Sequence, residues 1–178
     1  NPDSFHLGER VIIIGAGNAA MDVARTAVRK GAREVVCFSR TSSVAASRHE
    51  FDYASLEGVT FLYNKAPVEI VDEGVIFEDV VEKPGGTFAH VEGSRALYPA
   101  DSVIISISQG PRNRIVNTTK GIEVNARGLL VTDEEGRTTR PGVFASGDVV
   151  NGARTVVEAV EHSKHVAEAM DAYMRDLS

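Results

Sequence analysis

The sequence predicts an α/β fold in which a parallel sheet carries an inserted antiparallel β-meander. Within residues 11–30, a β-branched apolar run, a glycine-rich turn and an amphipathic helical stripe follow one another. A second buried strand comes directly after them, at residues 34–38. Between residues 68 and 91 the pattern changes to short apolar runs broken by turn residues, which is typical of antiparallel strands.

The composition is that of a chain able to form its own hydrophobic core. Of its 178 residues 43% are hydrophobic, and no apolar run approaches the ~20 residues of a membrane span. The net charge of −6 argues against a nucleic-acid-binding surface. The single cysteine, Cys37, excludes an internal disulfide and lies in an apolar run typical of a buried position. The polar first residues do not resemble a signal peptide, so we expect a cytoplasmic protein.

Residues 11–38 form a predicted βαβ unit. The β-branched run at 11–14 is expected to be a buried parallel strand, and the apolar positions of residues 18–30 recur at helical spacing. Gly31 can adopt the left-handed conformation that ends a helix. The apolar run at 34–38 then supplies the second strand of the unit.

The turn inside this unit has the Gly-x-Gly-x-x-Ala pattern that brings bare backbone and a helix N-terminus up to a pyrophosphate. Gly15 makes the turn, Gly17 leaves room for the phosphates, and Ala20 keeps the helix close to the strand. The candidate segment also includes Ala16, Asn18 and Ala19. In a chain with 16 glycines the triplet alone is a weak signal, and a glycine-rich turn without a ligand is the alternative. Its position between a strand and a helix favours a dinucleotide site.

The residues after the second strand bear on the choice of cofactor. An acidic residue there would bind the adenosine ribose and repel a 2′-phosphate. This chain instead has Ser39, Arg40 and Thr41, a cation between hydroxyls that suits a 2′-phosphate, so we expect NADP(H) rather than NAD(H). Arg48 is a second candidate cation, for which a solvated arginine at a helix start is an equal alternative.

The later elements are read from the same signals of periodicity and turn residues. A short helix is expected over residues 46–57, a third strand over 59–63, meander strands over 68–71, 74–81 and 87–91, and a buried strand over 102–106. Gln109 and Gly110 follow that strand, at a sheet end that faces ligands in doubly wound folds. In the last third of the sequence, the same signals predict short strands at 122–124 and 129–131 and a final helix over 154–174.

Several separated stretches together resemble one family. They are the Gly15-Ala-Gly-Asn-Ala-Ala-Met-Asp turn, Arg40 after the second strand, Ala100-Asp-Ser-Val-Ile-Ile, and Thr139-Arg-Pro-Gly-Val-Phe-Ala-Ser-Gly-Asp148. These stretches are similar to the C-terminal portion of the small (beta) subunit of NADPH-dependent glutamate synthase and related flavoproteins with two dinucleotide-binding domains. The resemblance implies a Rossmann-like NADP(H)-binding domain over residues 9–112 and the C-terminal segment of an FAD-binding domain over residues 113–178.

The resemblance also implies roles for residues of the second segment. Gly147 and Asp148 would belong to the second FAD motif, with the aspartate near the ribityl or pyrophosphate region of the flavin. A turn or N-cap aspartate is the alternative. Thr155 and Val156 would begin the helix whose N–H groups face a flavin carbonyl. Two other features of the family, the first FAD motif and an iron–sulfur segment with clustered cysteines, do not occur in this sequence, so we expect a partial chain.

The function implied by the resemblance is that of a flavin oxidoreductase. It would pass hydride from NADPH to FAD and electrons on to a partner, either the glutamate synthase large subunit or another acceptor such as ferredoxin. A catalytically incomplete NADP(H)-binding module is the alternative for the isolated chain. A disulfide reductase of the thioredoxin reductase type would need a cysteine pair, which Cys37 cannot supply.

No catalytic side chain or metal site is expected. Hydride transfer between nicotinamide and flavin depends on stacking, binding and electrostatics more than on acid–base side chains. His162 and His165 lie at helical spacing but lack a third ligand, so an exposed helix face is the better interpretation than a metal site.

Overall fold

A computed structural model describes residues 6–107, 110 and 114–177 of the chain. The chain forms two compact units, Asn1–Ser108 and Gln109–Ser178. The first unit contains both sheets, and the second contains short helices, loops and one long helix.

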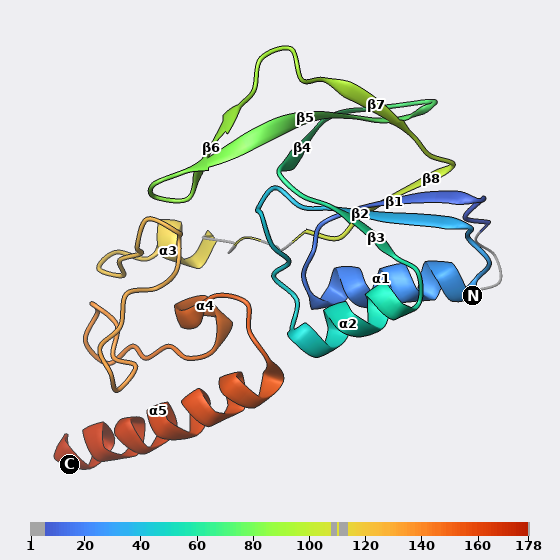
Figure 1. The fold of residues 1–178 in the computed structure, drawn as a ribbon. Coiled ribbons are helices and arrows are strands. Elements are labelled where there is room, and N and C mark those ends of the chain that lie inside the picture. Colours follow the sequence, from blue (N-terminus) through green and yellow to red (C-terminus); the bar gives the residue numbers. More distant parts are fainter. Residues whose placement is uncertain (1–5, 108–109, 111–113, 178) are drawn as a thin grey trace. The chain divides into compact units, whose positions relative to one another are not determined.

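A four-stranded parallel sheet forms the centre of the first unit. Its strands are β1 (Arg10–Ile14), β2 (Glu34–Phe38), β3 (Thr60–Leu62) and β8 (Ser102–Ile105), in the spatial order β3-β2-β1-β8. Two helices, α1 (Asn18–Arg29) and α2 (Arg48–Leu56), lie on one face of this sheet (Figure 1). The predicted βαβ unit is therefore confirmed.

The antiparallel sheet is inserted between β3 and β8. It consists of β4 (Lys65–Val71), β5 (Gly74–Lys83), β6 (Thr87–His90) and β7 (Ala96–Pro99), and β5 pairs with each of the others. It covers the face of the parallel sheet opposite the helices (Figure 1). The predicted meander is confirmed, although its fourth strand, β7, was not predicted.

The alternation of side chains along β1 divides the core of the first unit into two clusters. Val11 and Ile13 pack with α1, whereas Ile12 and Ile14 point toward the antiparallel sheet. On that second side the ring of Phe38 stacks on the ring of Phe77, with centroids 3.7 Å apart. A strand buried on both faces needs a continuous apolar run, which is what the sequence supplies here.

Asp101 ties the start of β1 to the start of β8. Its Oδ2 atom accepts hydrogen bonds from the backbone N–H groups of Glu9 and Arg10, each at 2.8 Å, and its Oδ1 atom accepts one from the Arg10 guanidinium at 3.0 Å. The N–H and the guanidinium of Arg10, with the N–H of Glu9, hold the pKa of Asp101 below its ordinary value. Asp101, in the Ala-Asp segment, thus has a structural role in holding the starts of β1 and β8 together.

The second unit contains little regular structure in its described residues apart from three helices. These are α3 (Arg114–Thr118), α4 (Asp148–Asn151) and α5 (Val156–Asp176). The strands predicted at 122–124 and 129–131 are wrong, because only one isolated bridge, Val124 to Leu130, forms there. The Asn125 side chain accepts from the N–H groups of Arg127 and Leu129, and backbone bonds from Asn125 N–H to the Leu129 carbonyl and from Val131 N–H to the Glu123 carbonyl make up that bridge.

The loops of the second unit pack on the final helix. A Cβ atom added to Gly136 would lie 2.4 Å from a methyl carbon of Val166 on α5, so the loop backbone lies directly on the helix. Leu129, Val166 and Ala169 are buried, and the ring of Phe144 meets the edge of Tyr173. Within the described residues, none of the helices is both long and apolar enough to span a bilayer.

Candidate functional site

The glycine turn after β1 is fixed by close backbone contacts. Gly15 has a φ of +132°, and a Cβ atom added to it would lie 2.1 Å from the carbonyl oxygen of Ser106, at the end of β8. The Gly15 N–H donates to the carbonyl of Phe38, at the end of β2, at 3.0 Å. The turn is therefore locked between the ends of the two strands that flank β1, and only glycine fits at position 15.

Gly17 differs from Gly15, because nothing in the described structure opposes a side chain there. It is the N-cap of α1 with a φ of −89°, and a Cβ atom built on it meets no heavy atom within 4 Å. It offers no side-chain hydrogen bond to the helix, and the first turn of α1 contains no acidic residue. The helix N-terminus is thus left open to an anion, and the arrangement fits a pyrophosphate.

The other residues of the segment hold this turn in place. The Ala16 carbonyl accepts from the N–H groups of Ala45 and Ala46, and the Asn18 Oδ1 atom accepts from the N–H of Ser47 at 2.8 Å. Ala20 is completely buried against the sheet, as expected for the third position of the pattern. Ala19 is exposed at the mouth of the turn.

The hydroxyl groups of the loop after β2 are used within the loop. The Thr41 Oγ1 atom donates to the carbonyl of Ser43 at 2.7 Å, and the Ser39 and Thr41 hydroxyl oxygens lie 2.9 Å apart. The Thr41 N–H also donates to the Ser39 Oγ atom. Each hydroxyl has one proton, and both protons have acceptors within the loop. Ser39 and Thr41 therefore shape the loop that presents Arg40.

The two candidate arginines are in different surroundings. In the part of the chain that the structure describes, no carboxylate lies within ion-pair distance of Arg40, and its guanidinium lies 5.2 Å from the ring centroid of Phe88 on β6. Arg48 is the first residue of α2 and forms an ion pair with Asp52 at 2.9 Å. Its side chain is 86% exposed, so the structure favours the helix-start interpretation of Arg48.

Phe88 contacts the candidate residue Arg40 and was not predicted from the sequence. It belongs to the meander, far along the chain from Arg40, and a phenylalanine in a short alternating strand carries no signal of a cation opposite it. Of the predicted residues that follow β8, Gln109 lies outside the described residues. Gly110 is exposed, with open space around a built Cβ atom.

A second candidate site lies in the second unit, where an open groove of about 470 Å³ runs along the start of α5. Its lining includes Asp148, Thr155 and Val156, so three of the four predicted residues of this segment come together. Gly147 precedes them with a φ of +72°, a conformation that favours glycine. The Asp148 carboxylate accepts only a long bond, 3.4 Å, from the N–H of Arg154.

A capping box fixes the start of α5. The Thr155 hydroxyl accepts from the N–H of Glu158, and the Glu158 carboxylate accepts from the hydroxyl and the N–H of Thr155. Together with the Arg154 guanidinium, these donors lower the pKa of Glu158 to about 2. Because the Thr155 N–H is occupied, the N–H groups that α5 leaves open begin at Val156.

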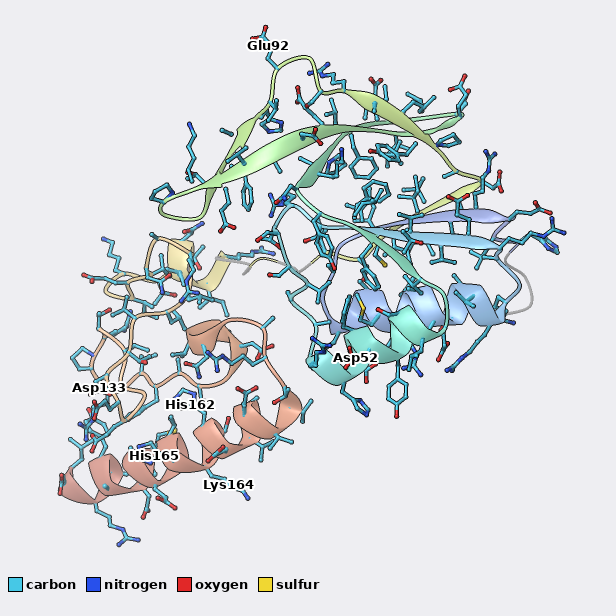
Figure 2. All side chains as sticks on the ribbon, in the orientation of Figure 1. Asp52, Glu92, Asp133, His162, Lys164 and His165 are labelled. Atoms are coloured by element: carbon cyan, nitrogen blue, oxygen red, sulfur yellow. The ribbon has the colours of Figure 1, made fainter. Side chains whose placement is uncertain are left out.

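His162 and His165 do not form a metal site. Among the residues that the structure describes, no group of three or more histidine, cysteine or acidic side chains could hold a metal ion. The Nδ1 atom of His162 accepts from the Gly147 N–H at 3.1 Å and lies 3.1 Å from the Asn151 amide nitrogen. Figure 2 shows His162 on the side of α5 that faces the loop leading to α4. His162 therefore braces the Gly147 turn.

Cys37 is buried on β2, in the cluster between the parallel sheet and α1. Burial raises the pKa of its thiol to about 12. A thiol in this environment is an inert part of the core, as predicted.

A parallel sheet with a glycine turn at a helix N-terminus defines a dinucleotide-binding protein of the α/β class. More particularly, the chain belongs to the pyridine nucleotide-disulphide oxidoreductase family, whose model matches residues 2–163.

Two curated relatives and one solved structure illustrate the membership. The glutamate synthase [NADPH] small chain of Halomonas elongata is 34% identical over 94% of this chain and 39% of its own length. The NADP(+)-dependent formate dehydrogenase subunit beta of Moorella thermoacetica is 35% identical over 94% of this chain and 25% of its own length. The chain therefore spans well under half of these relatives. Thioredoxin reductase of T. acidophilum shares the fold, with a TM-score of 0.74 at 23% identity over 97% of this chain and 54% of that one.

Proposed function

We propose that this chain is the NADPH-binding portion of a flavin oxidoreductase that passes hydride from NADPH to FAD and electrons on to a partner. The observation that carries the proposal is the open N-terminus of α1 behind Gly17, with Arg40 at the end of the neighbouring strand β2. The pyrophosphate would lie on the helix N-terminus, and the adenosine end would extend toward the loop after β2.

The arginine supplies the preference for the 2′-phosphate in this proposal. Arg40 has no carboxylate partner in the described structure, so its N–H donors remain available to an anion. Ser39 and Thr41 serve it indirectly, because their hydroxyl protons hold the loop together. The absence of an acidic residue from positions 39–43 removes the group that would favour NAD(H).

The second unit would contribute to the FAD site. Asp148 offers a carboxylate largely free of bonds in the described structure, and Val156 begins the open N-terminus of α5. When bound, FAD supplies the capacity to accept a hydride and release its electrons to a further acceptor. The positive end of the α5 dipole would stabilise negative charge at the edge of the flavin.

The partner would be another subunit of an electron-transferring assembly. The relatives are named a small chain and a subunit beta, which supports a role as one component of a complex. The glutamate synthase large subunit is the first candidate for that partner. A ferredoxin-type acceptor is the alternative.

Titration of the chain with NADPH and NADH tests this proposal. We expect NADPH to bind more tightly, and we expect Arg40→Gln to weaken NADPH binding about tenfold or more while NADH binding stays unchanged, because a charge-assisted hydrogen bond is lost. Arg48→Gln is the matched control, with a small expected effect. Failure of the unmodified chain to bind either nucleotide would refute the proposal. A diaphorase assay with added FAD then determines whether the chain turns over by itself.

A further inference from the structure

The guanidinium of Arg40 lies over the ring of Phe88. The Cζ atom of Arg40 is 5.2 Å from the ring centroid, within the range of a cation–π contact. Phe88 is on β6, in the antiparallel sheet, whereas Arg40 follows β2 of the parallel sheet. The contact therefore connects the inserted meander to the loop that is proposed to bind the cofactor.

Phe88 does not serve the hydrophobic core. The described aromatic stack of the first unit consists of Phe38, Phe77 and Tyr98, and Phe88 makes no ring contact with it. Its partner across the sheet is Glu82, on the exposed end of β5. The Phe88 ring is partly exposed near the end of a hairpin and contacts the Arg40 guanidinium. Its role therefore concerns that arginine rather than the core.

The contact with Phe88 can restrict the conformations of the Arg40 side chain before a ligand binds. Arginine has a long side chain that loses rotamer freedom when it binds a ligand. A ring in contact with the guanidinium restricts the side chain before the ligand arrives, and a cation–π contact occupies no oxygen acceptor, so the N–H donors can still bind an anion. A pre-oriented arginine loses less entropy on binding, and the difference adds to the affinity for the anion.

We propose that Phe88 is a positioning residue for Arg40 and that the meander thereby contributes to selection of 2′-phosphorylated adenine dinucleotides. This inference rests on the proposed function, because it assigns Phe88 to the same binding site. The contribution acts through Arg40, so it applies to NADPH and leaves NADH unaffected.

Phe88→Leu and Phe88→Tyr are the variants that test it. Leucine keeps apolar bulk but removes the π face, whereas tyrosine keeps the ring. We expect Phe88→Leu to weaken NADPH binding about two- to fivefold, since exposed cation–π contacts have energies of this order. Phe88→Tyr should bind NADPH as tightly as the unmodified chain. NADH affinity should be the same for all three proteins. Thermal unfolding of each variant verifies that the fold is intact.

The double variant with Arg40→Gln separates positioning from any direct contact with the nucleotide. With Arg40 replaced, Phe88→Leu should have no further effect on NADPH binding. The inference is overturned if Phe88→Leu leaves NADPH binding unchanged, weakens NADPH and NADH equally, or still weakens NADPH in the Arg40→Gln background. If the unmodified chain does not prefer NADPH, the proposed function is refuted, and this inference is refuted with it because it depends on that preference.

Discussion

Gly15 and Ser106 approach so closely that a Cβ atom on residue 15 would lie 2.1 Å from the Ser106 carbonyl oxygen. The contact joins the turn after β1 to the end of β8, whose Ser106 N–H donates to the Ile14 carbonyl at 2.8 Å. Gly17, two residues on, faces open space. The two glycines of one motif are therefore separable, because the first is required by the packing of the turn and the second leaves open the space in which the pyrophosphate is proposed to bind.

Alanine substitutions at these two positions should affect different properties, stability at Gly15 and nucleotide binding at Gly17. Gly15→Ala should lower the free energy of unfolding by about 2 kcal/mol or more, because it adds both backbone strain and overlap with Ser106. Gly17→Ala should change stability by less than about 1 kcal/mol, since its φ of −89° suits any residue, yet weaken NADPH binding about tenfold or more. Urea unfolding and nucleotide titration measure the two effects. Equal stability loss in both variants would contradict this separation.

Asp101→Asn should lower the thermal stability, and the loss should depend on pH. The donors around Asp101 stabilise its charged form, so its folded-state pKa lies below the unfolded one. The stabilisation is therefore present above the unfolded pKa and disappears as the pH falls through the folded pKa. Melting curves between neutral pH and pH 3 should show a difference in melting temperature between the unmodified protein and Asp101→Asn, and this difference should become smaller in acid. A difference in melting temperature that does not change with pH would contradict the prediction and point to a steric cause.

Thr155→Ala should destabilise α5 by about 1 kcal/mol, because the N-cap hydroxyl is lost. Glu158→Gln removes the charge of the same capping box and should also lower stability at neutral pH. The pKa of about 2 for Glu158 means that this charge persists in acid and that its contribution is lost only as the pH falls from the ordinary range toward 2. Helical circular dichroism during unfolding measures both variants. Thr155→Ser, which keeps the hydroxyl, is the control.

The Cys37 thiol should not react with a disulfide reagent in the folded protein at pH 8. Its burial and a pKa of about 12 leave almost no thiolate and no access. The same thiol should react fully in denaturant, which makes the unfolded chain the internal control. Rapid reaction under native conditions would show that β2 opens readily.

The first half of the fold was predictable because its signals are local. The β-branched run, the glycine turn and the helical stripe each occupy consecutive residues, and β2 was predicted with its observed bounds. β7 was missed because Ala96–Pro99 is a short segment ending in proline, and its pairing with β5 is a long-range contact. In the second unit, the short runs on either side of Asn125 looked like strands, but the pairing between them is limited to one isolated bridge, Val124 to Leu130.

The candidate site was predictable to the same extent. Gly15, Gly17 and Arg40 follow from the pattern of one βαβ unit, whose topology brings them to one edge of a sheet. The use of the Ser39 and Thr41 hydroxyls within their own loop, and the ring of Phe88 beneath Arg40, depend on three-dimensional contacts. Neither follows from spacing along the chain.

The strand β5 is built in two parts along its length. Its first part, residues 74–80, is mostly buried and packs on the parallel sheet, while residues 81–83 are exposed and lead to the hairpin that carries Phe88. Because the exposed part adds little to the core, an exchange of residues 82–88, which leaves the contact of His90 with the buried Glu78 intact, would leave the folding of the domain largely unaffected. With Phe88 in its proposed role, a lineage with this architecture could change its nucleotide preference through this hairpin while the two sheets beneath it stay constant.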